Sequence, residues 1–384
     1  MSTIKVDGIR SNSASSDAIT LASNGTCTAN ITNNLSNRNK VINGSMICSQ
    51  RGTQQTGANS SGYKNACDRW RFNAGGANVG AYTVSQSTTT PDGFGNSLKV
   101  DCTTARTPTN NEFLEIQQRI EGQNLQDFAK GTSAAKKFTL SFYVKTNVSG
   151  NYVVWLYDND NQRMVGGLYT VSDSNWNRYT ISYPADTTGA FGNDNERSLD
   201  VRFVLLAGTD FTSGTLPTTA WATYAAANSL AGQTANVASS TSNEFYLTGV
   251  QLEVGSVATD FEHRSFAQEL ALCQRYFYKT YNQATALGTN TSVGAFMFSL
   301  PVSQSYASMP SVRYPVTMRV APSVTAYSTT NANTTGVMSA DSNDKTTTIH
   351  QIGENGHFPF VNNSSSGISV NIFLRHHFTA DAEL

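Results

Sequence analysis

Charged residues are scarce in this sequence. Lys, Arg, Asp and Glu make up 14% of its 384 residues, against roughly a quarter in an average soluble protein. The net charge at pH 7 is -1, which gives no electrostatic basis for binding nucleic acid or an anionic membrane. Thr, Ser, Asn and Gly take the place of the charged residues, and they suit exposed strand positions and tight turns.

Cysteine is also scarce. The five cysteines are Cys27, Cys48, Cys67, Cys102 and Cys273. Their number is odd and no CxxC pair occurs, so we expect reduced, mostly buried thiols and no disulfide framework. The first ten residues lack the apolar stretch of a secretory signal, and no apolar run approaches the length of a membrane span. We therefore expect a protein that is made and kept soluble in a reducing cytoplasm.

Catalytic motifs are absent from the sequence. It contains no nucleophile elbow, zinc-protease motif or P-loop, and no repeat of fixed period that would indicate a β-helix. Glu112 and Glu115 lie close together, but spacing alone does not reveal the geometry of a glycosidase pair. We expect a protein that is not an enzyme and has no cofactor.

Two turns rich in Asp and Asn could supply oxygen ligands to Ca²⁺. The first holds Asp158, Asp160 and Asn161, and the second is Asn193–Asn195. Neither has the full EF-hand pattern, and these residue types are favoured in turns for their own hydrogen bonding. We therefore expect no metal at either turn. His376 and His377 are adjacent on an expected strand and so point to opposite faces, which prevents one chain from using both at one site.

Alternating apolar and polar residues predict strands along most of the chain. The clearest examples are residues 138–144, 152–157, 176–183 and 199–206. Turn-forming residues separate them and no long helix interrupts them, which favours an all-β, jelly-roll-like sandwich. A long Ala/Thr/Ser-rich insertion at residues 208–243, containing Trp221 and Tyr224, is expected to cover part of the core or to carry a function.

Residues 245–277 combine two periods. Residues 245–254 alternate, and this alternation predicts a strand with Tyr246, Thr248, Val250, Leu252 and Val254 on one face. Further on, Phe266, Leu270, Cys273 and Phe277 follow the spacing of one helix face. Ser265 and Gln268 have the spacing of a capping box at the start of that helix. The sequence therefore predicts a strand and then a short helix at the joint between two β-domains.

Three regions follow from these patterns. Residues 1–36 are short β-like pieces, too few to bury a core, and indicate an anchoring or trimerisation arm; a flexible leader is the alternative. Residues 37–280 form the jelly-roll-like sandwich, which ends in the strand–helix joint. Residues 281–384 form a smaller C-terminal β-sandwich domain, or tip.

Polar and aromatic side chains lie opposite the expected core positions. If apolar residues such as Ile116, Val154 and Phe203 face the core, the outward faces carry Tyr143, Lys145, Trp155, Tyr157, Glu115, Gln117, Arg119 and Arg202, with Gln251 and Glu253. Rings among carboxylates, amides and cations suit sugar binding, because rings stack on pyranoses and polar groups fix the hydroxyls. The same side chains could instead form cross-strand pairs or a subunit interface. The sequence leaves these alternatives open.

Several segments resemble virion domains of bacteriophages. Residues 249–277, GVQLEVGSVATDFEHRSFAQELALCQRYF, resemble the closing segment of the β-sandwich domain in tail-fibre and related virion proteins, especially of marine phages. NKVINGSMICSQRG at residues 39–52, followed by Asp68-Arg69-Trp70, resembles the opening of the same domain. Residues 316–319 and FTADAEL at residues 378–384 resemble the tip domains that close such chains. Together these segments span residues 37–384.

The resemblance implies a virion protein that is assembled in the host cytoplasm. It implies a homotrimeric tail fibre or spike, held by other tail proteins through its N-terminal arm and without membrane insertion. Host recognition would use weak, multivalent contacts with surface glycans, and the family supplies no catalytic residues. Two alternatives remain: a structural capsid decoration or tail connector without a receptor, and a glycan-cleaving depolymerase.

Overall fold

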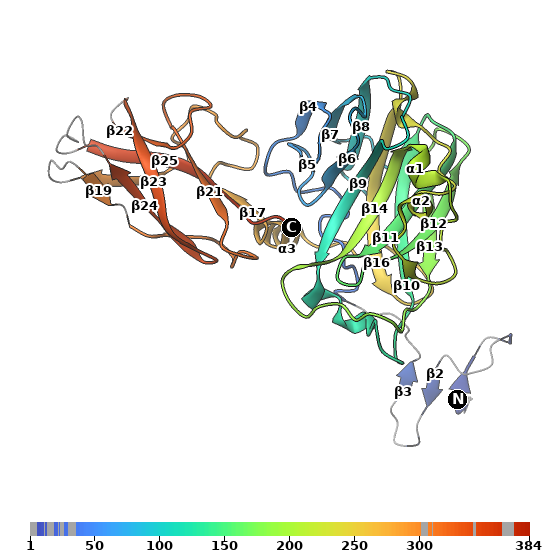
Figure 1. Cartoon of the computed structure of the whole chain (residues 1–384). Helices are drawn as coiled ribbons and strands as arrows, with labels where there is room; N and C mark the ends of the chain where they lie inside the picture. The colour runs from blue at the N-terminus through green and yellow to red at the C-terminus, as the bar shows by residue number, and fades with distance from the viewer. Residues whose placement is uncertain are drawn as a thin grey trace.

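The structure is a computed structural model of the chain. It describes residues 6–10, 12–13, 19–21, 23, 27–29, 36–300, 306–308, 310–340, 343–362 and 372–384. Antiparallel strands are the dominant secondary structure of these residues, so the expected all-β fold is confirmed. Figure 1 shows two β units side by side, with three short strands apart from them at the N-terminal end of the chain.

The three N-terminal strands form a small sheet of their own. They are β1 (Gly8–Ile9), β2 (Ile19–Leu21) and β3 (Cys27–Ala29), paired in this order. β2 and β3 coincide with two of the short β-like pieces expected in this region. Residues 1–5, 11, 14–18, 22, 24–26 and 30–35 of this region lie outside the described residues.

Two antiparallel sheets form the central sandwich. The six-stranded sheet has the order β13 (Asn177–Tyr183), β10 (Phe138–Thr146), β16 (Glu244–Val254), β8 (Ser97–Thr104), β7 (Ala81–Ser87) and β4 (Gln54–Ala58). The seven-stranded sheet has the order β15 (Ala222–Thr223), β12 (Arg163–Val171), β11 (Gly150–Asp158), β14 (Arg197–Ala207), β9 (Phe113–Glu121), β6 (Arg71–Gly75) and β5 (Gly62–Tyr63). Strands distant in sequence are neighbours in both sheets, so the sandwich forms only when much of the chain has come together.

Short helical turns lie in the loops of the sandwich. They are η1 (Gly122–Asn124), η2 (Gln126–Phe128), α1 (Thr209–Thr212), α2 (Ala226–Ser229) and η3 (Val237–Ser239). The last three belong to the long insertion between β14 and β16. None of the helices in the described part of the chain is long and apolar enough to cross a membrane.

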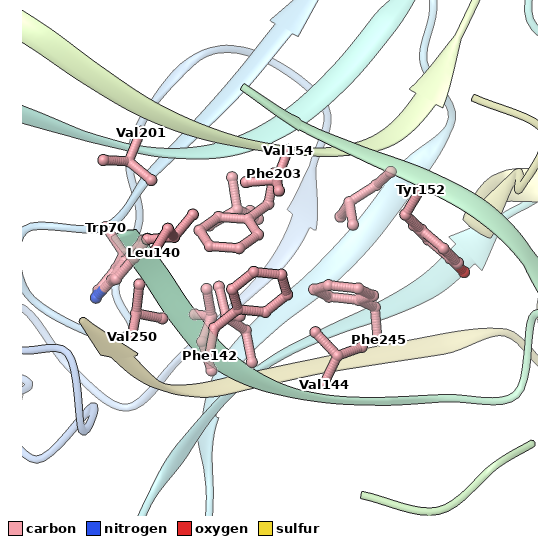
Figure 2. Packing of buried hydrophobic residues seen from close by; sticks show 14 of the residues in the cluster. Trp70, Leu140, Phe142, Val144, Tyr152, Val154, Val201, Phe203, Phe245 and Val250 are labelled. Carbon is pink, nitrogen blue, oxygen red and sulfur yellow. The ribbon is translucent and has the colours of Figure 1, made fainter. Parts of the chain in front are cut away.

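Apolar side chains from both sheets fill the space between them (Figure 2). Phe142 of β10 meets Phe203 of β14 edge to face, with 5.0 Å between ring centroids. Trp70 lies beside the same ring at 6.1 Å. Burying one large apolar side chain stabilises a fold by about 1.5–3 kcal/mol, so this cluster is the main source of stability. The inward positions expected for β9, β10, β11 and β14 are confirmed.

One face assignment was wrong. Tyr246 and Thr248 were expected on the same face of β16 as Val250. The structure instead places Phe245 and Leu247 in the core together with Val250. The alternation therefore changes phase within the strand, and Tyr246 lies on the outer side of the sheet.

A bulge at Gly249 causes this change of phase. Ser141 pairs with Gln251, whereas Tyr143 pairs with Thr248, so β16 has one more residue than β10 between these pairs. Gly249 has φ 61°, the left-handed backbone that suits a glycine in such a bulge. A Cβ atom at Gly249 would lie 2.8 Å from a ring carbon of Tyr143. Glycine is therefore required for both backbone and space, which the simple alternation did not reveal.

The expected helix is present as α3 (Phe266–Gln274). The Ser265 hydroxyl accepts the Gln268 N–H at 3.3 Å, and the Gln268 side chain accepts the Ser265 N–H at 3.0 Å. These two bonds form the predicted capping box and satisfy donors that the first turn leaves free.

The buried stripe predicted for this helix was partly wrong. Phe266 is 50% exposed, whereas Glu269 and Cys273 are buried. The Glu269 carboxylate accepts the backbone N–H of Asn43 at 2.5 Å, and this bond turns the polar side of the helix toward the sandwich. Cys273 and Phe277, the second half of the stripe, are buried as expected.

The described strands of the C-terminal unit form one nine-stranded sheet. Its main path is β17 (Phe277–Lys279), β25 (Ile372–Asp381), β22 (Val337–Ala340), β23 (Asn343–Gly353), β24 (Gly356–Asn362) and β19 (Tyr306–Ser308). The strands β18 (Phe296–Leu300) and β21 (Ser323–Tyr327) pair with β25, and β20 (Val312–Arg313) pairs with β24. Four strands pair with β25, which makes it the central strand of the unit.

The end of the chain returns from β25 to the sandwich, as the position of the C label beside α3 indicates (Figure 1). Arg51 lies 3.0 Å from the Asp381 carboxylate and 3.2 Å from that of Glu383. Glu383 also pairs with Arg69, which is 1% exposed and stacks on the ring of Tyr276 at 3.4 Å. The two units are therefore joined through buried charges and not through apolar surface alone.

The four cysteines whose side chains the structure describes are buried and free. They are Cys48, Cys67, Cys102 and Cys273. The expectation of buried, reduced thiols is confirmed for these four, while the side chain of Cys27 lies outside the described residues.

The C-terminal unit also buries neutral histidines. His376 lies among the rings of Phe296 and Phe378, and its neighbour His377 stacks on Tyr281 at 3.7 Å. Burial lowers the pKa of His376 to about 3 and that of His357 to about 4. Both imidazoles therefore stay uncharged in the folded unit at neutral pH.

We predict that acid destabilises the C-terminal unit. The unfolded chain protonates these imidazoles near their ordinary pKa of about 6.5, while the folded unit does not. Stability is therefore lost as the pH falls through about 6.5, by about 2 kcal/mol for each of His357 and His376 at about pH 5. Urea unfolding at about pH 7.5 and pH 5 measures the difference. His376→Phe should lose its share of the pH dependence; an unchanged dependence would contradict the account.

Candidate functional site

The outer face of the seven-stranded sheet carries a continuous row of polar and aromatic side chains. The strand register places Trp155 opposite Arg202, Arg202 opposite Gln117, Gln117 opposite Arg71, and Arg71 opposite Tyr63. Directly opposed residues lie on one face with their Cβ atoms roughly 4.5–5.5 Å apart. The five side chains therefore cross the sheet from β11 to β5.

Two flanking rows widen this face. On one side, Tyr157 lies opposite Asp200, and Asp200 lies opposite Arg119. On the other side, Glu115 lies opposite Asn73, which donates to the Glu115 carboxylate at 2.8 Å. The face thus combines rings, guanidinium groups, carboxylates and amides.

Six of the eight predicted glycan-binding residues come together here. They are Glu115, Gln117, Arg119, Trp155, Tyr157 and Arg202. Tyr143 and Lys145 do not join them, because β10 belongs to the six-stranded sheet. Alternation along a strand separates the core from the exterior but does not show which of the two sheets a strand enters. Whether any of these residues binds a glycan stays a prediction.

Tyr143 and Lys145 have surroundings of their own on the opposite sheet. The ring of Tyr143 lies 5.4 Å from that of Phe94, and the Lys145 ammonium lies 5.9 Å above the ring of Tyr246. Gln251 and Glu253, also expected beside the site, lie on β16 of that sheet and bond to each other at 3.0 Å.

The insertion covers the Trp155 end of the row. Leu216, Leu230 and Ala231 pack on Trp155, which is 2% exposed. Its indole N–H donates to the Glu115 carboxylate at 2.7 Å. The expected covering role of the insertion is therefore observed, and Trp155 and Glu115 are enclosed by the chain itself. Figure 1 shows α1 and α2, the helices of this insertion, over the strands at this end.

The insertion also contributes an aromatic ring that the sequence-based prediction left out of the site. Tyr224 stacks on Trp155, with 6.2 Å between centroids and 16° between planes, and meets Tyr157 edge to face at 5.4 Å. Tyr224 is 38% exposed. The sequence contained one indication of this role: a tyrosine in a stretch of Ala, Thr and Ser. Such a loop has no core of its own in which the ring could be buried.

Four guanidinium groups occupy the rest of the face. Arg202 donates to Asp200 at 2.6 Å and lies 4.5 Å above the ring of Trp155. Arg197 donates to the same carboxylate at 2.7 Å. Arg119 donates to the backbone carbonyl of Leu384 at 2.5 Å, and Arg71 donates to Asn73 at 2.6 Å. Arg71 and Arg197 were not predicted, because Arg71 precedes the part of the sequence with clear alternation and a bulge moves Arg197 out of phase.

Charge is unevenly balanced on this face. Burial would raise the pKa of Asp200, but Arg202 and Arg197 hold it below its ordinary value, so Asp200 is ionised. Burial raises the pKa of Glu115, and the neighbouring Arg202 offsets this only in part. Burial, together with repulsion by Arg197 and Arg71, lowers the pKa of Arg119 to about 10. The positive charges on this face therefore outnumber the negative charges, and they repel one another.

Gln117 lies in the middle of this face without a partner. It is fully buried, and within the described part of the chain neither its Oε1 nor its Nε2 atom has a hydrogen-bond partner. Buried side-chain amides are normally bonded, because leaving one unpaired costs about 1–3 kcal/mol. We name the four arginines Arg71, Arg119, Arg197 and Arg202, with Gln117, Tyr157 and Tyr224, the arginine patch.

Asp158 in the first Asx-rich turn is occupied by protein partners. Lys130, buried with it, places its ammonium 2.5 Å from the Asp158 carboxylate and 3.1 Å from that of Asp186. Asp160 accepts the Gly192 N–H at 2.8 Å. In the second turn, the Asn195 side chain donates to the Arg319 carbonyl at 2.6 Å. No group of three or more His, Cys, Asp or Glu in the described residues is arranged to hold a metal ion.

No protein-family model matches the chain, and no curated protein matches it. Among solved structures, the enzymatically active domain of tailspike protein 4 from bacteriophage CBA120 is similar over 56% of this chain and 21% of its own, with 13% identity and a TM-score of 0.31. A CBM4 structure is similar over 55% of this chain and 97% of its own, with 13% identity and a TM-score of 0.26. The family 11 carbohydrate-binding module from Clostridium thermocellum, in complex with a β-1,3-1,4-mixed-linked tetrasaccharide, has 11% identity, a TM-score of 0.27, and coverage of 55% and 99%. The chain thus spans about a fifth of the tailspike chain, and similarity at this level assigns no ligand.

We predict that Gln117→Leu does not destabilise the protein. The leucine removes an unpartnered buried amide, so the free energy of unfolding should stay constant or rise by about 1–3 kcal/mol. The neighbouring Gln118 is the matched control, because its amide exchanges two bonds of 2.7 Å with the backbone of Ile42. Gln118→Leu should lower the stability by a similar amount. Urea unfolding of both variants measures this, and a clear loss in Gln117→Leu would show that the amide has a structural partner.

Proposed function

We propose that this protein is a host-attachment protein that binds surface glycans through the arginine patch. The observation that carries the proposal is the unpartnered Gln117 amide, which lies between Arg71 and Arg202 on the sheet face that also carries Tyr157, with Tyr224 packed on Tyr157. An amide can both donate to and accept from sugar hydroxyls. The exposed ring of Tyr224 supplies a surface on which a pyranose can stack.

The side chains of the patch are held in place by their neighbours. Tyr224 is held against Trp155 and Tyr157, and Arg202 is fixed by Asp200, so little side-chain entropy remains to be lost on binding. The insertion closes one side of the face and the end of the chain borders the other, where Arg119 and Tyr63 both donate to the Leu384 carbonyl. A site of this kind favours a short stretch of a glycan over an extended protein surface.

We propose further that the chain acts in a virion as a homotrimeric tail fibre or spike. This rests on the resemblance of several segments to phage virion domains, and their arrangement supports it. Asn39 of the opening segment bonds to Leu252 of the closing segment at 3.1 Å, and Arg69 of the opening segment pairs with Glu383 of the tip segment. The segments that resemble phage virion domains therefore contact one another in the structure, as expected if the chain shares the architecture of those domains.

The glycan proposal is tested by removing the partly exposed Tyr157 ring and the exposed Tyr224 ring. We expect the double variant Tyr157→Ala, Tyr224→Ala to bind a glycan array or host cells at least about 5-fold more weakly, since each stacked ring is worth about 0.5–1.5 kcal/mol. Trp155 is unsuitable for this test because it is buried. Phe266→Ala, which removes an exposed ring on α3, is the control and should bind normally. An unchanged signal in the double variant would remove the patch from glycan binding, and a wild-type chain that binds no glycan would favour a purely structural virion role.

The proposed trimer is tested separately. Light scattering on the full chain should give three times the 41.4 kDa mass of one chain, at concentrations down to the micromolar range. A monomer would contradict the trimer without bearing on the arginine patch, because every side chain of the patch comes from a single chain.

A further inference from the structure

We infer that the glycan bound by the arginine patch is acidic and that a sugar carboxylate lies against Arg119 and Arg71. The inference rests on the proposed glycan function and adds the chemical class of the ligand. It follows from three features of the patch: its unbalanced charge, the unpaired donors within it, and the position of Gln117 between the arginines.

The first feature is the use of the carboxylates already present. Asp200 accepts from both Arg197 and Arg202. Glu115 accepts from Trp155 and Asn73 and lies 3.5 Å from Arg202. Both acidic groups are therefore fully engaged on the β14 side of the patch.

The second feature is the state of the other two arginines. In the part of the chain that the structure describes, no Asp or Glu side chain pairs with Arg71 or Arg119. Arg71 donates to an amide oxygen of Asn73. Arg119 donates at 2.5 Å to a main-chain oxygen of Leu384, the last residue of the given sequence, and its buried Nε–H has no partner. A guanidinium group offers a fork of donors that fits a carboxylate with two parallel bonds. The patch thus contains donors suited to one more anion.

The third feature is Gln117, which lies opposite Arg71 on one side and Arg202 on the other. Its amide carries no charge and can accept as well as donate. Guanidinium groups alone would suit any small anion, whereas a neighbouring acceptor suits a hydroxyl on the same molecule. Together they match a sugar that bears both groups, such as a hexuronate or a sialic acid.

Two other basic positions lack this imbalance. At the joint, Arg51 lines a pocket of about 440 Å³, but Asp381 and Glu383 neutralise it. On the six-stranded sheet, Lys99 lies 2.8 Å from Glu244. Because the whole chain has a net charge of only -1, the attraction for an anion is local and should weaken as salt screens it.

The test compares acidic saccharides with their neutral parents on the full chain. The probes are sialyllactose with lactose, oligogalacturonate with its carboxyl-reduced form, and dextran sulfate with dextran. We expect at least one carboxylate probe to bind about 10-fold or more tightly than its parent. We also expect the difference to shrink in Arg71→Gln at unchanged melting temperature, and in Arg119→Gln, which also removes the bond to Leu384. Arg119→Lys, which keeps the charge but not the forked arrangement of donors, should lose much of the preference for the acidic probe.

Arg313→Gln, at an exposed arginine of the C-terminal unit, is the control for unspecific polyanion binding and should change nothing.

The possible outcomes distinguish the acidic-ligand inference from the proposed glycan function. Equal binding of acidic and neutral members, lost in Tyr157→Ala, Tyr224→Ala, would overturn the acidic ligand and leave the proposed glycan function intact. Preference for dextran sulfate alone would overturn the carboxylate. Acid preference that persists in both glutamine variants would place the anion outside the arginine patch. No binding by any member would overturn the glycan function together with this inference.

Discussion

The buried pairing of Glu383 with Arg69 and Arg51 is the interaction on which the arrangement of the two β units depends. Arg69 is almost fully enclosed and stacked on Tyr276, and a buried guanidinium group without a counter-ion would cost about 3–5 kcal/mol. Its partner comes from the last residues of the sequence. The buried guanidinium groups of Arg69 and Arg51 are therefore neutralised only when the C-terminal unit is docked, and the docked segment in turn brings Leu384 to Arg119. Folding of the joint and one border of the arginine patch are thus coupled.

The joint also explains why α3 presents its polar side inward. Glu269 accepts the backbone N–H of Asn43, and Asn43 itself bonds to the carbonyls of Cys48 and Asp68. The end of the helix is fixed in the same way, since Arg275 forms two bonds of 2.9 and 2.8 Å with Glu121 of β9. Polar bonds with defined geometry set the angle between the units, while the apolar core stabilises each unit.

The sequence predicted what depends on local chemistry. The inward faces of β9, β10, β11 and β14 follow from alternation, and α3 follows from its capping box. It did not predict the phase change at Gly249, because a bulge adds one residue without any change in composition. Nor could it place β10 in a different sheet from β11, which separated Tyr143 from Trp155. Both outer faces of a sandwich carry the same kind of polar pattern, so the partition of strands between sheets depends on long-range pairing.

The candidate site shows the same division. Six of its residues were predicted from their outward positions. Trp155, whose indole ring is the largest of them and was expected to stack on a sugar, is instead buried in one cluster with Leu216 and Leu230 of the insertion. The same insertion places an exposed ring, that of Tyr224, on this face. Tertiary packing has thus moved the accessible aromatic surface from a strand to a loop. A period-based prediction detects the strand residue and has no signal for where a loop will fold.

The most direct test of this account is a crystal structure of the chain with an acidic oligosaccharide bound. The account predicts the sugar carboxylate on the guanidinium groups of Arg71 and Arg119, a hydroxyl on the Gln117 amide, and a pyranose ring against Tyr224. A sugar bound on the six-stranded sheet or in the joint, with Gln117 unchanged, would contradict it.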